Sequence, residues 1–355
     1  MTDEPIRIPA DRLTDFTADV LSAAGAKTGD AQKIAAHLVG ANLTGHDSHG
    51  VQLLPGYVMN IQQELVAIDA EPVVLADAPV ITRLDAGGGW GVLGGEALIE
   101  SLSLKAKVSG LAGGTIGNVH HLGRIGAYAE RAAQAGLVSM HFVSVADHDP
   151  LVAPFRGSDA RFGTNPVCIA FPETANRAMF LLDMATSQIA LGKARVALNK
   201  GVKVPHGSII NAQGMLTDDP SCMAAGAMTG ALTPVGRHKG YGLAFACELL
   251  GGVLSGAGTI QPGNERRGGI QNRMLSILID PAAFGDTAWM ESEIEAMADY
   301  ALASPPLDWD SPVLFPGDPE RAMRGKRAKQ GVPLDPVTVG GMNAAAEAVG
   351  VKERL

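Results

Sequence analysis

Residues 41–57, ANLTGHDSHGVQLLPGY, set the organisation of the chain. They place His46 and His49, an aspartate, a serine and two glycines within six residues, directly after an apolar run with helical spacing. Polar groups crowded beside apolar ones cost free energy unless each has a partner or serves a site. One imidazole could hold a hydroxyl or carbonyl oxygen while a neighbour fixes its tautomer. A structural alternative stays open, in which the first glycine ends a helix and the residues after it cap the next turn.

The composition argues against several classes of protein. The chain has 355 residues, 46% hydrophobic and 18% charged, which is enough for two domains and is unlike a disordered protein. A net charge of -9 argues against a nucleic-acid groove, because phosphate binding depends on clustered Lys and Arg. We interpret the one basic run, residues 321–329, as the solvated face of a helix. Three unpaired cysteines and the lack of a signal peptide or long apolar stretch predict a cytoplasmic protein that binds neither nucleic acid nor membrane.

Apolar periodicity predicts a helical lead-in followed by a region of mixed strands and helices. Helices are expected to begin at Pro9 and after Gly25, and to cover residues 57–64, 96–109, 125–135, 240–254 and 287–302. Strands are expected over residues 80–85, 113–117, 138–145, 167–171, 180–183 and 274–279. Near residue 75 the sequence changes from helical periodicity to short apolar runs and glycines, and we expect a domain boundary there.

Residues 89–94, GWGVLG, match the GxGxxG pattern of a dinucleotide-binding βαβ unit. That unit also needs an acidic residue at the end of its second strand to hold the ribose. After the strand expected over 113–117, the chain offers Asn118, His120 and His121, and no acid before Glu130. We therefore interpret these glycines as a strand-to-helix turn and not as a Rossmann site.

A second polar cluster, residues 118–126 with sequence NVHHLGRIG, lies between an expected strand and an expected helix. Backbone N–H groups at a helix start, with Arg124 adding a fixed positive charge, suit a phosphate or a carboxylate. One structural alternative is a buried histidine beside a surface one. A further alternative is a zinc site formed by His120 and His121 together with His46 and His49, although the chain has no HExxH or CxxC signature.

Three later motifs favour a small anionic ligand. RFGTNP at 161–166 predicts a turn, LDMATS at 182–187 puts an acid and two hydroxyls at a strand end, and GRHKGYG at 236–242 opens an apolar helix with cations. The hydroxyls could be ordinary caps or could contact ribose and amide groups. A cationic, glycine-rich helix start suits a pyrophosphate.

Eight motifs now stand in one order across nearly the whole chain: GHDSHGV, NVHHLGRIGAY, VAPF, RFGTNP, LDMATSQIALGK, GMLTDDP, HKGYGLA and FPGD. In these motifs the chain resembles the malate/L-lactate dehydrogenase-like family of NAD(P)-dependent oxidoreductases, and most of all its hydroxycarboxylate dehydrogenase B branch. The resemblance implies a mixed α/β, non-Rossmann fold of the L-sulfolactate dehydrogenase type. A central nicotinamide-binding domain, residues 76–279, would be flanked by a helical dimerisation domain from residues 1–75 and 280–355 of an intertwined homodimer.

The resemblance also implies the roles of individual residues. The cofactor would be NAD or NADP, no metal would be needed, and the partner would be a small 2-hydroxy or 2-oxo acid. The catalytic acid/base would be His49 or His121, with Ser48 beside the first of them. Cofactor contacts would fall on His49, Gly123, Arg124, Ile125, Leu181, Leu182, Asp183, Met184, Ala185, His238, Lys239, Asn272, Gly317, Asp318, Pro319 and Glu320.

Two positions depart from the family pattern. Many relatives have an arginine four residues after the SHG histidine, a plausible clamp for the substrate carboxylate, and this chain has Leu53 there. Either Arg124 takes that role, or the substrate carries an apolar group that contacts Leu53. The family's GWAxDxxG turn is altered too, to GSIINAQG at residues 207–214.

Together these observations predict reversible hydride transfer between a nicotinamide and C2 of a 2-hydroxycarboxylate of the lactate, malate or aryl-lactate type. A histidine with a pKa near neutrality would move the proton in both directions. Two alternatives remain: a metal-dependent hydrolase built on the four histidines, and a protein that binds a small anion without chemistry.

Overall fold

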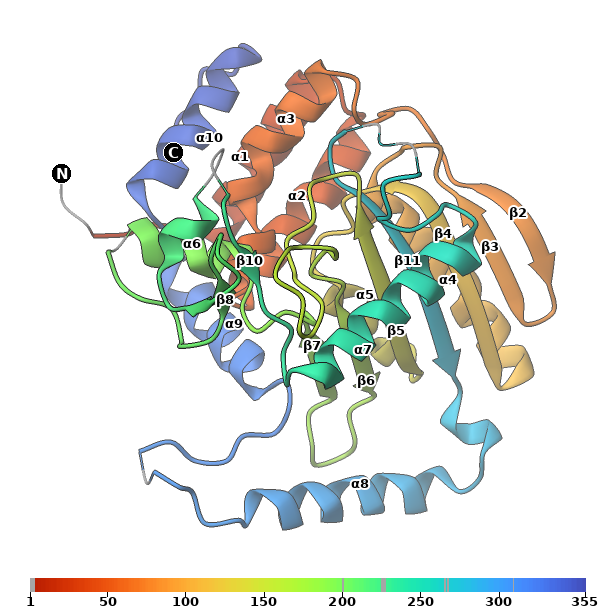
Figure 1. Cartoon of the computed structure of the whole chain (residues 1–355). Helices are drawn as coiled ribbons and strands as arrows, with labels where there is room; N and C mark the ends of the chain where they lie inside the picture. The colour runs from red at the N-terminus through yellow and green to blue at the C-terminus, as the bar shows by residue number, and fades with distance from the viewer. Residues whose placement is uncertain (1–3, 200, 225–227, 265, 267, 309) are drawn as a thin grey trace.

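A seven-stranded mixed sheet forms the centre of the computed structural model, which describes residues 4–199, 201–224, 228–264, 266, 268–308 and 310–355 (Figure 1). The strand order is β2-β3-β4-β11-β5-β6-β7. The strands are β2 (Val73–Ala78), β3 (Ile81–Asp85), β4 (Leu111–His120), β5 (Val138–Ala146), β6 (Val167–Phe171), β7 (Phe180–Met184) and β11 (Gln271–Ile279). β3 and β4 pair in parallel, and the other neighbours in this sheet pair antiparallel. A Rossmann domain has a parallel, doubly wound sheet, so the prediction that GxGxxG is not a Rossmann site is confirmed.

Helices α4 (Gly91–Ser109) and α5 (Gly126–Gln134) pack their apolar sides on the sheet. Leu98, Leu102 and Tyr128 are fully buried there, in one core cluster with Ile116 of β4 and Met274 of β11. Helix α7 (His238–Cys247) continues into a π-helix, η4 (Glu248–Val253), which packs on β5 and β11. The sheet is therefore covered by helices that come from different parts of the chain.

The two ends of the chain pack together beside the sheet (Figure 1). The elements are α1 (Ala10–Ala23), α2 (Thr28–Leu43), α3 (Leu54–Gln62) and α10 (Pro336–Ala348), with β1 (Ile6–Ile8) paired to β12 (Val332–Leu334). Leu13, Ile34 and Leu54 from the first part and Met342 from the last share one buried apolar cluster. The domain limits at residues 75 and 280 stay a prediction.

A smaller unit lies between the sheet and the chain ends. It contains α6 (Leu191–Asn199), β8 (Ile209–Ile210), β9 (Leu216–Thr217), β10 (Ala231–Leu232) and the short helix η3 (Pro220–Met223). The altered turn at 207–214 belongs to it, and Asn211 closes that turn by accepting hydrogen bonds from the backbone of Gln213 and Met215. Val152, Phe162 and Leu232 form part of its own apolar cluster.

Most of the expected elements are confirmed, and the differences have local causes. Helix α4 begins five residues before the expected start, since its first glycines allow close packing. Strand β4 runs on to His120 because Gln271 of β11 pairs with that residue. The helix expected over 240–254 is present, with its second half in π geometry. The sequence analysis missed β1, β2, β12, α6 and α10, which are short or have weak periodicity.

The interpretation of residues 321–329 as a solvated helix face is wrong at one position. They lie in α9 (Asp318–Gln330), but Arg327 is buried, at 8% exposure. Its guanidinium donates to Asp47 Oδ1 at 2.6 Å and to Asp47 Oδ2 at 3.0 Å. A charge pattern along a helix cannot show a partner that is so distant in the chain.

Helix α8 (Thr287–Leu302) lies apart from the other helices and runs along the bottom of the view in Figure 1, after the short turn η5 (Pro281–Ala283). Its Glu295 accepts hydrogen bonds from Thr174 and Asn176 in the β6–β7 connection. Large apolar side chains on α8 are exposed, including Trp289 at 62% and Tyr300 at 79%. Among the described residues, no helix is both long enough and apolar enough to span a membrane.

Candidate active site

Residues 41–57 form a tightly held turn between α2 and α3. Two short 3-10 helices, η1 (Asp47–His49) and η2 (Val51–Leu53), follow Gly45, which ends α2 with φ of +87°. The buried Asn42 bonds on both sides: its Nδ2 donates to Asp47 Oδ1 at 2.7 Å, and its Oδ1 accepts from the Val51 backbone at 2.8 Å. Arg327 holds Asp47 from the other side. The structural alternative is therefore correct for Gly45, which ends the helix, and wrong for the cap, because Asp47 binds Asn42 and Arg327 and the side chain of Ser48 contacts His49.

The structure brings His49 and His121 together. Their rings stack with centroids 5.7 Å apart and an interplanar angle of 16°. Ser48 Oγ lies 3.0 Å from His49 Nδ1, and the Tyr57 hydroxyl lies 2.8 Å from His121 Nδ1. Both rings are partly exposed, so a small molecule can reach them. The pair thus has the geometry of a proton-transfer centre in which each imidazole is held by its own hydroxyl.

Burial sets the protonation of this pair. It lowers the pKa of His49 to about 4, while Asp183 raises that pKa and His46 and Arg124 lower it further. Burial, followed by the nearby His49, also lowers the pKa of His121 well below its usual value. Both rings are therefore neutral near pH 7, whereas the sequence analysis expected a pKa near neutrality. Spacing along the chain cannot show how far packing in the folded protein removes these two imidazoles from water.

The hydroxyl of Tyr57 lies 2.8 Å from Nδ1 of His121, and which of the two atoms donates depends on the tautomer of the ring. Burial raises the pKa of the Tyr57 hydroxyl, so the oxygen keeps its proton near pH 7. A neutral imidazole that donates from Nδ1 to this oxygen has an unprotonated Nε2, which can accept a proton.

The four histidines of the sequence analysis do not converge. His120 is fully buried, with Nε2 at 2.8 Å from Asn60 Nδ2 and its ring against the edges of Tyr57 and Trp90. His46 Nε2 lies 3.2 Å from Glu320 Oε1. No group of three His, Cys, Asp or Glu side chains within the described part of the chain could hold a metal. The zinc alternative and the hydrolase built on it have no support.

Three of the segments expected to bind the cofactor meet beside the histidine pair. Asp183 Oδ2 accepts from the Gly126 backbone at 2.9 Å, which joins β7 to the start of α5. Leu181 donates from its backbone to Pro316 O at 3.2 Å, which brings the start of α9 to β7. Gly317, at φ of +98°, packs against the Leu181 side chain, and Glu320 reaches His46. The segments that contain Gly123, Ile125, Leu182, Met184, Ala185, Asp318 and Pro319 therefore pack side by side.

Arg124, in one of these segments, carries an unpaired donor. Its side chain is 3% exposed, its Nη2 pairs with Glu130, and its Nη1 is buried with no hydrogen-bond partner. A buried guanidinium N–H without a partner is costly, so a bound carboxylate or phosphate would satisfy it. The residues present therefore fit an anionic cofactor or substrate.

Four other predicted residues are placed differently. Asn272 Oδ1 accepts from the Leu122 backbone at 2.8 Å and its Nδ2 donates to Gln271 O, so its amide supports the turn before Gly123. His238 and Lys239 are exposed at the start of α7, where the His238 ring lies against Phe155. In the described residues no hydrogen bond or ring contact joins them to the histidine pair. Leu53 is partly buried against the apolar cluster of the chain ends.

Several residues of the site were missed by the sequence analysis. Tyr57, Asn42 and Arg327 hold the site, and His37 Nε2 accepts from the Arg124 backbone at 3.0 Å. Tyr57 lies at the end of the stretch that opened the analysis, but no spacing pairs it with a histidine on another strand. Contacts of this kind depend on tertiary packing.

Known proteins share this architecture. The family model described as malate/L-lactate dehydrogenase matches residues 8–343. Hydroxycarboxylate dehydrogenase B of Escherichia coli (strain K12) is 41% identical over 350 residues, which cover 98% of this chain and 95% of that protein. A solved structure of a putative malate/lactate dehydrogenase from E. coli has a TM-score of 0.93 at 40% identity, covering 98% of this chain and 96% of that one. Sulfolactate dehydrogenase from Methanocaldococcus jannaschii has a TM-score of 0.85 at 29% identity, covering 98% of each chain. The expected fold is confirmed.

Proposed function

The chain belongs to the malate/L-lactate dehydrogenase family and is an oxidoreductase that acts on CH–OH groups, and we propose that His121 moves the proton in its reaction. The reaction interconverts a 2-hydroxycarboxylate and its 2-oxo acid. The observation that carries the proposal is the stacked His49–His121 pair, in which Tyr57 contacts Nδ1 of His121, and we assign Nε2 of that ring to the substrate. The bound nicotinamide accepts or supplies the hydride at C2.

In oxidation, the hydroxyl at C2 gives its proton to the unprotonated Nε2 of neutral His121, which becomes an imidazolium as the hydride leaves C2. In reduction, the imidazolium, which has taken up a proton from solvent, returns it from Nε2 to the oxygen as the carbonyl is lost, and the ring is neutral again. In this proposal the Tyr57 oxygen accepts from Nδ1–H of His121, which keeps Nε2 for the substrate, and Ser48 contacts Nδ1 of the neighbouring His49. Both rings are neutral before substrate binds, because burial lowers their pKa values. In this proposal His49, which stacks on His121, orients the oxygen at C2 of the substrate.

The cofactor is proposed to lie on the surface formed by residues 123–125, 181–185 and 317–320. The unpartnered Nη1 of Arg124 and the approach of Gly317 to Leu181 support this placement. Two backbone hydrogen bonds, Val235 N to Thr186 O at 2.9 Å and Gln188 N to Thr233 O at 2.7 Å, bring the segment before His238 and Lys239 alongside the end of this region. Both NAD and NADP stay candidates, and parallel assays with NADH and NADPH distinguish them.

We propose a homodimer in which α8 contacts a second copy of the chain. The helix carries exposed Trp289, Met297 and Tyr300, and large exposed apolar side chains in series are costly in water. Sedimentation velocity at micromolar concentration tests the dimer.

A cytoplasmic location is proposed as well, since the three cysteines are free.

A panel of 2-oxo acids tests the function. Pyruvate, phenylpyruvate, 2-oxoglutarate and oxaloacetate are to be supplied with NADH and with NADPH while the absorbance of the reduced cofactor is followed. Because Leu53 cannot pair with a distal carboxylate, whose unpaired burial would cost several kcal/mol, we expect a higher kcat/KM for phenylpyruvate than for oxaloacetate. The preference should grow gradually with side-chain size, at about 1 kcal/mol per methylene-sized contact. A clear preference for oxaloacetate would contradict the Leu53 argument, and no turnover of any acid would contradict the function.

The variant Arg124→Met is expected to raise KM for every 2-oxo acid by a similar factor. The guanidinium would contact the carboxylate that all these substrates share, and methionine keeps the apolar stem without the charge. Steady-state kinetics on the same panel measure the effect, and a direct titration with the reduced cofactor shows whether cofactor binding changes instead. An unchanged KM would remove Arg124 from the substrate site.

A further inference from the structure

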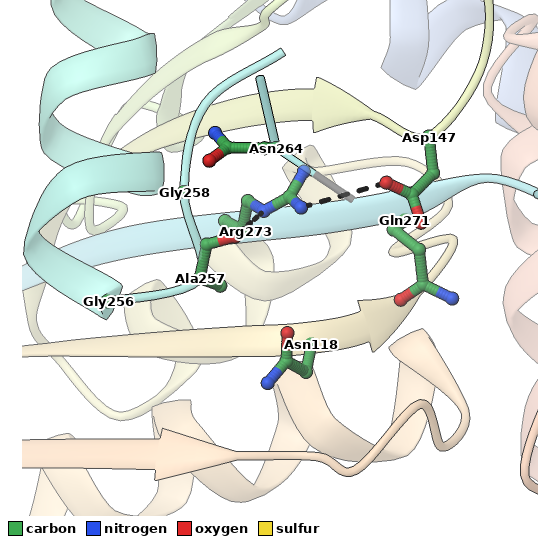
Figure 2. A pocket seen from close by; sticks show the side chains of 8 residues that line it. All are labelled: Asn118, Asp147, Gly256, Ala257, Gly258, Asn264, Gln271 and Arg273. Atoms are coloured by element: carbon green, nitrogen blue, oxygen red, sulfur yellow. Dashed lines mark hydrogen bonds and ion pairs between the residues drawn. The ribbon is translucent and has the colours of Figure 1, made fainter. Parts of the chain in front are cut away.

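A polar cavity of about 270 Å³ lies at the ends of three neighbouring strands (Figure 2). Its walls come from the end of β4, the segment after β5, the start of β11 and the loop that follows η4. The lining residues are Asn118, Asp147, Gly256, Ala257, Gly258, Asn264, Gln271 and Arg273. None of them has a part in the proposed proton transfer or cofactor surface.

Arg273 is the charged centre of this cavity. Its side chain is only 6% exposed, its Nε donates to Ala257 O at 3.2 Å, and its Nη2 lies 3.8 Å from Asp147 Oδ1. Its Nη1 is buried and has no hydrogen-bond partner among the described residues. A buried guanidinium N–H normally has an acceptor, because leaving one unsatisfied is costly. An acceptor from a ligand in the cavity would satisfy this donor.

The Arg273 side chain and the side chain that supports the turn after His121 lie on opposite faces of β11. Successive side chains of a strand point to opposite faces. Asn272 points toward Leu122 and supports the turn that follows His121, whereas Arg273 points toward Ala257 in the loop after η4. Figure 2 shows the Arg273 guanidinium between that loop and Asp147. A ligand on Arg273 therefore occupies a different face of β11 from the one that supports the catalytic turn.

The surroundings of Arg273 favour a ligand of low charge. The carboxylate of Asp147 is also buried, at 8% exposure, and offsets much of the positive charge of the guanidinium. Asp147 repels a dianion such as phosphate more strongly than a single carboxylate, because the repulsion scales with the charge of the ligand. The buried amide of Gln271 and the amide of Asn264 are neutral groups on the same walls. Gly256 and Gly258, at φ of +77° and +83°, let the loop close around the cavity without a side chain.

We propose that the Arg273 cavity binds the carboxylate group of a small monocarboxylic acid at a site separate from the histidine pair. The carboxylate accepts a hydrogen bond from Nη1 of Arg273, and the amides on the walls contact the rest of the acid. Binding here needs no turnover, so its failure and the failure of the proposed function can be distinguished.

Isothermal titration with propionate and with inorganic phosphate, in buffers of equal ionic strength, tests the proposal. Propionate is expected to bind the wild-type chain, and Arg273→Gln should weaken that binding about tenfold or more, the usual scale for a charge-assisted hydrogen bond. Arg273→Lys keeps the charge without the planar donor geometry, and should bind with intermediate affinity. Phosphate should bind more weakly than propionate.

The variant His49→Ala is the matched control, because it alters the catalytic pair and leaves the cavity intact. The binding that depends on Arg273 should persist in it unchanged. Equal propionate affinity in wild type and Arg273→Gln would overturn the proposal, as would loss of that binding in His49→Ala or tighter binding of phosphate. Thermal melts without ligand establish that each variant is folded. If Arg273→Gln does not fold, wild type is compared with Arg273→Lys instead. Equal propionate affinity in these two proteins would then count against the proposal.

Discussion

His121→Ala and His49→Ala are each expected to lower kcat by about 10² or more, the usual effect of losing a group that transfers or guides a proton. The first variant loses Nε2, the atom proposed to exchange the proton, and the second loses the ring stacked on His121 at 5.7 Å. Because burial lowers the pKa of His121 well below its usual value, oxidation of a 2-hydroxy acid should keep its rate through neutral pH and lose it only at acidic pH, where this ring becomes protonated. Steady-state kinetics in both directions, extended below pH 5 as far as the chain stays folded, measure these effects.

Two hydroxyl variants serve as controls for the histidine pair. Tyr57→Phe removes the hydroxyl at 2.8 Å from His121 Nδ1, so the ring can take the wrong tautomer, and we expect a fall in kcat of roughly tenfold with little change in KM. Ser48→Ala is the equivalent change for His49. Wild-type rates in both His121→Ala and His49→Ala would contradict the proposed mechanism. A loss in His49→Ala alone would transfer the acid/base role to His49.

Gly91→Ala is expected to destabilise the chain by about 2–3 kcal/mol, the scale of an extra carbon forced into a packed site. A Cβ at this position would lie 2.0 Å from the carbonyl oxygen of His121 and 2.3 Å from that of His120. Both atoms belong to the backbone at the end of β4, which cannot move without shifting His121. The variant should therefore lose activity as well as stability, and chemical denaturation with urea measures the free energy of unfolding.

Gly40→Ala is the matched control, because Gly40 lies inside α2 and a Cβ there meets nothing within 4 Å. Alanine is the better helix former, so this variant should be stabilised by about 0.5–1 kcal/mol. Comparing Gly91→Ala with Gly40→Ala also tests whether the GxGxxG pattern is a dinucleotide site. If Gly91→Ala kept its stability and lost only cofactor binding, the pattern would be a dinucleotide site after all.

The amino-acid sequence alone determined many of the helices and strands, and the two polar clusters whose histidines meet in the structure. Apolar periodicity is a local property, so α1, α2, β5 and β7 could be predicted within a few residues. The absence of a ribose-binding acid after residues 113–117 was enough to reject a Rossmann unit. His49 and His121 stood out because two polar clusters interrupt apolar segments, and the collinear motifs connected them to one family.

Only the tertiary structure decided what each of these residues does. His120 and His121 are adjacent, yet the first is buried against Asn60 and the second stacks on His49, since the end of β4 turns between them. Arg327 appeared to belong to a solvated run and instead holds Asp47. The low pKa of His49 follows from burial, which no local pattern reveals. Packing brings together segments far apart in the chain, and the environment it creates sets tautomer, charge and contact.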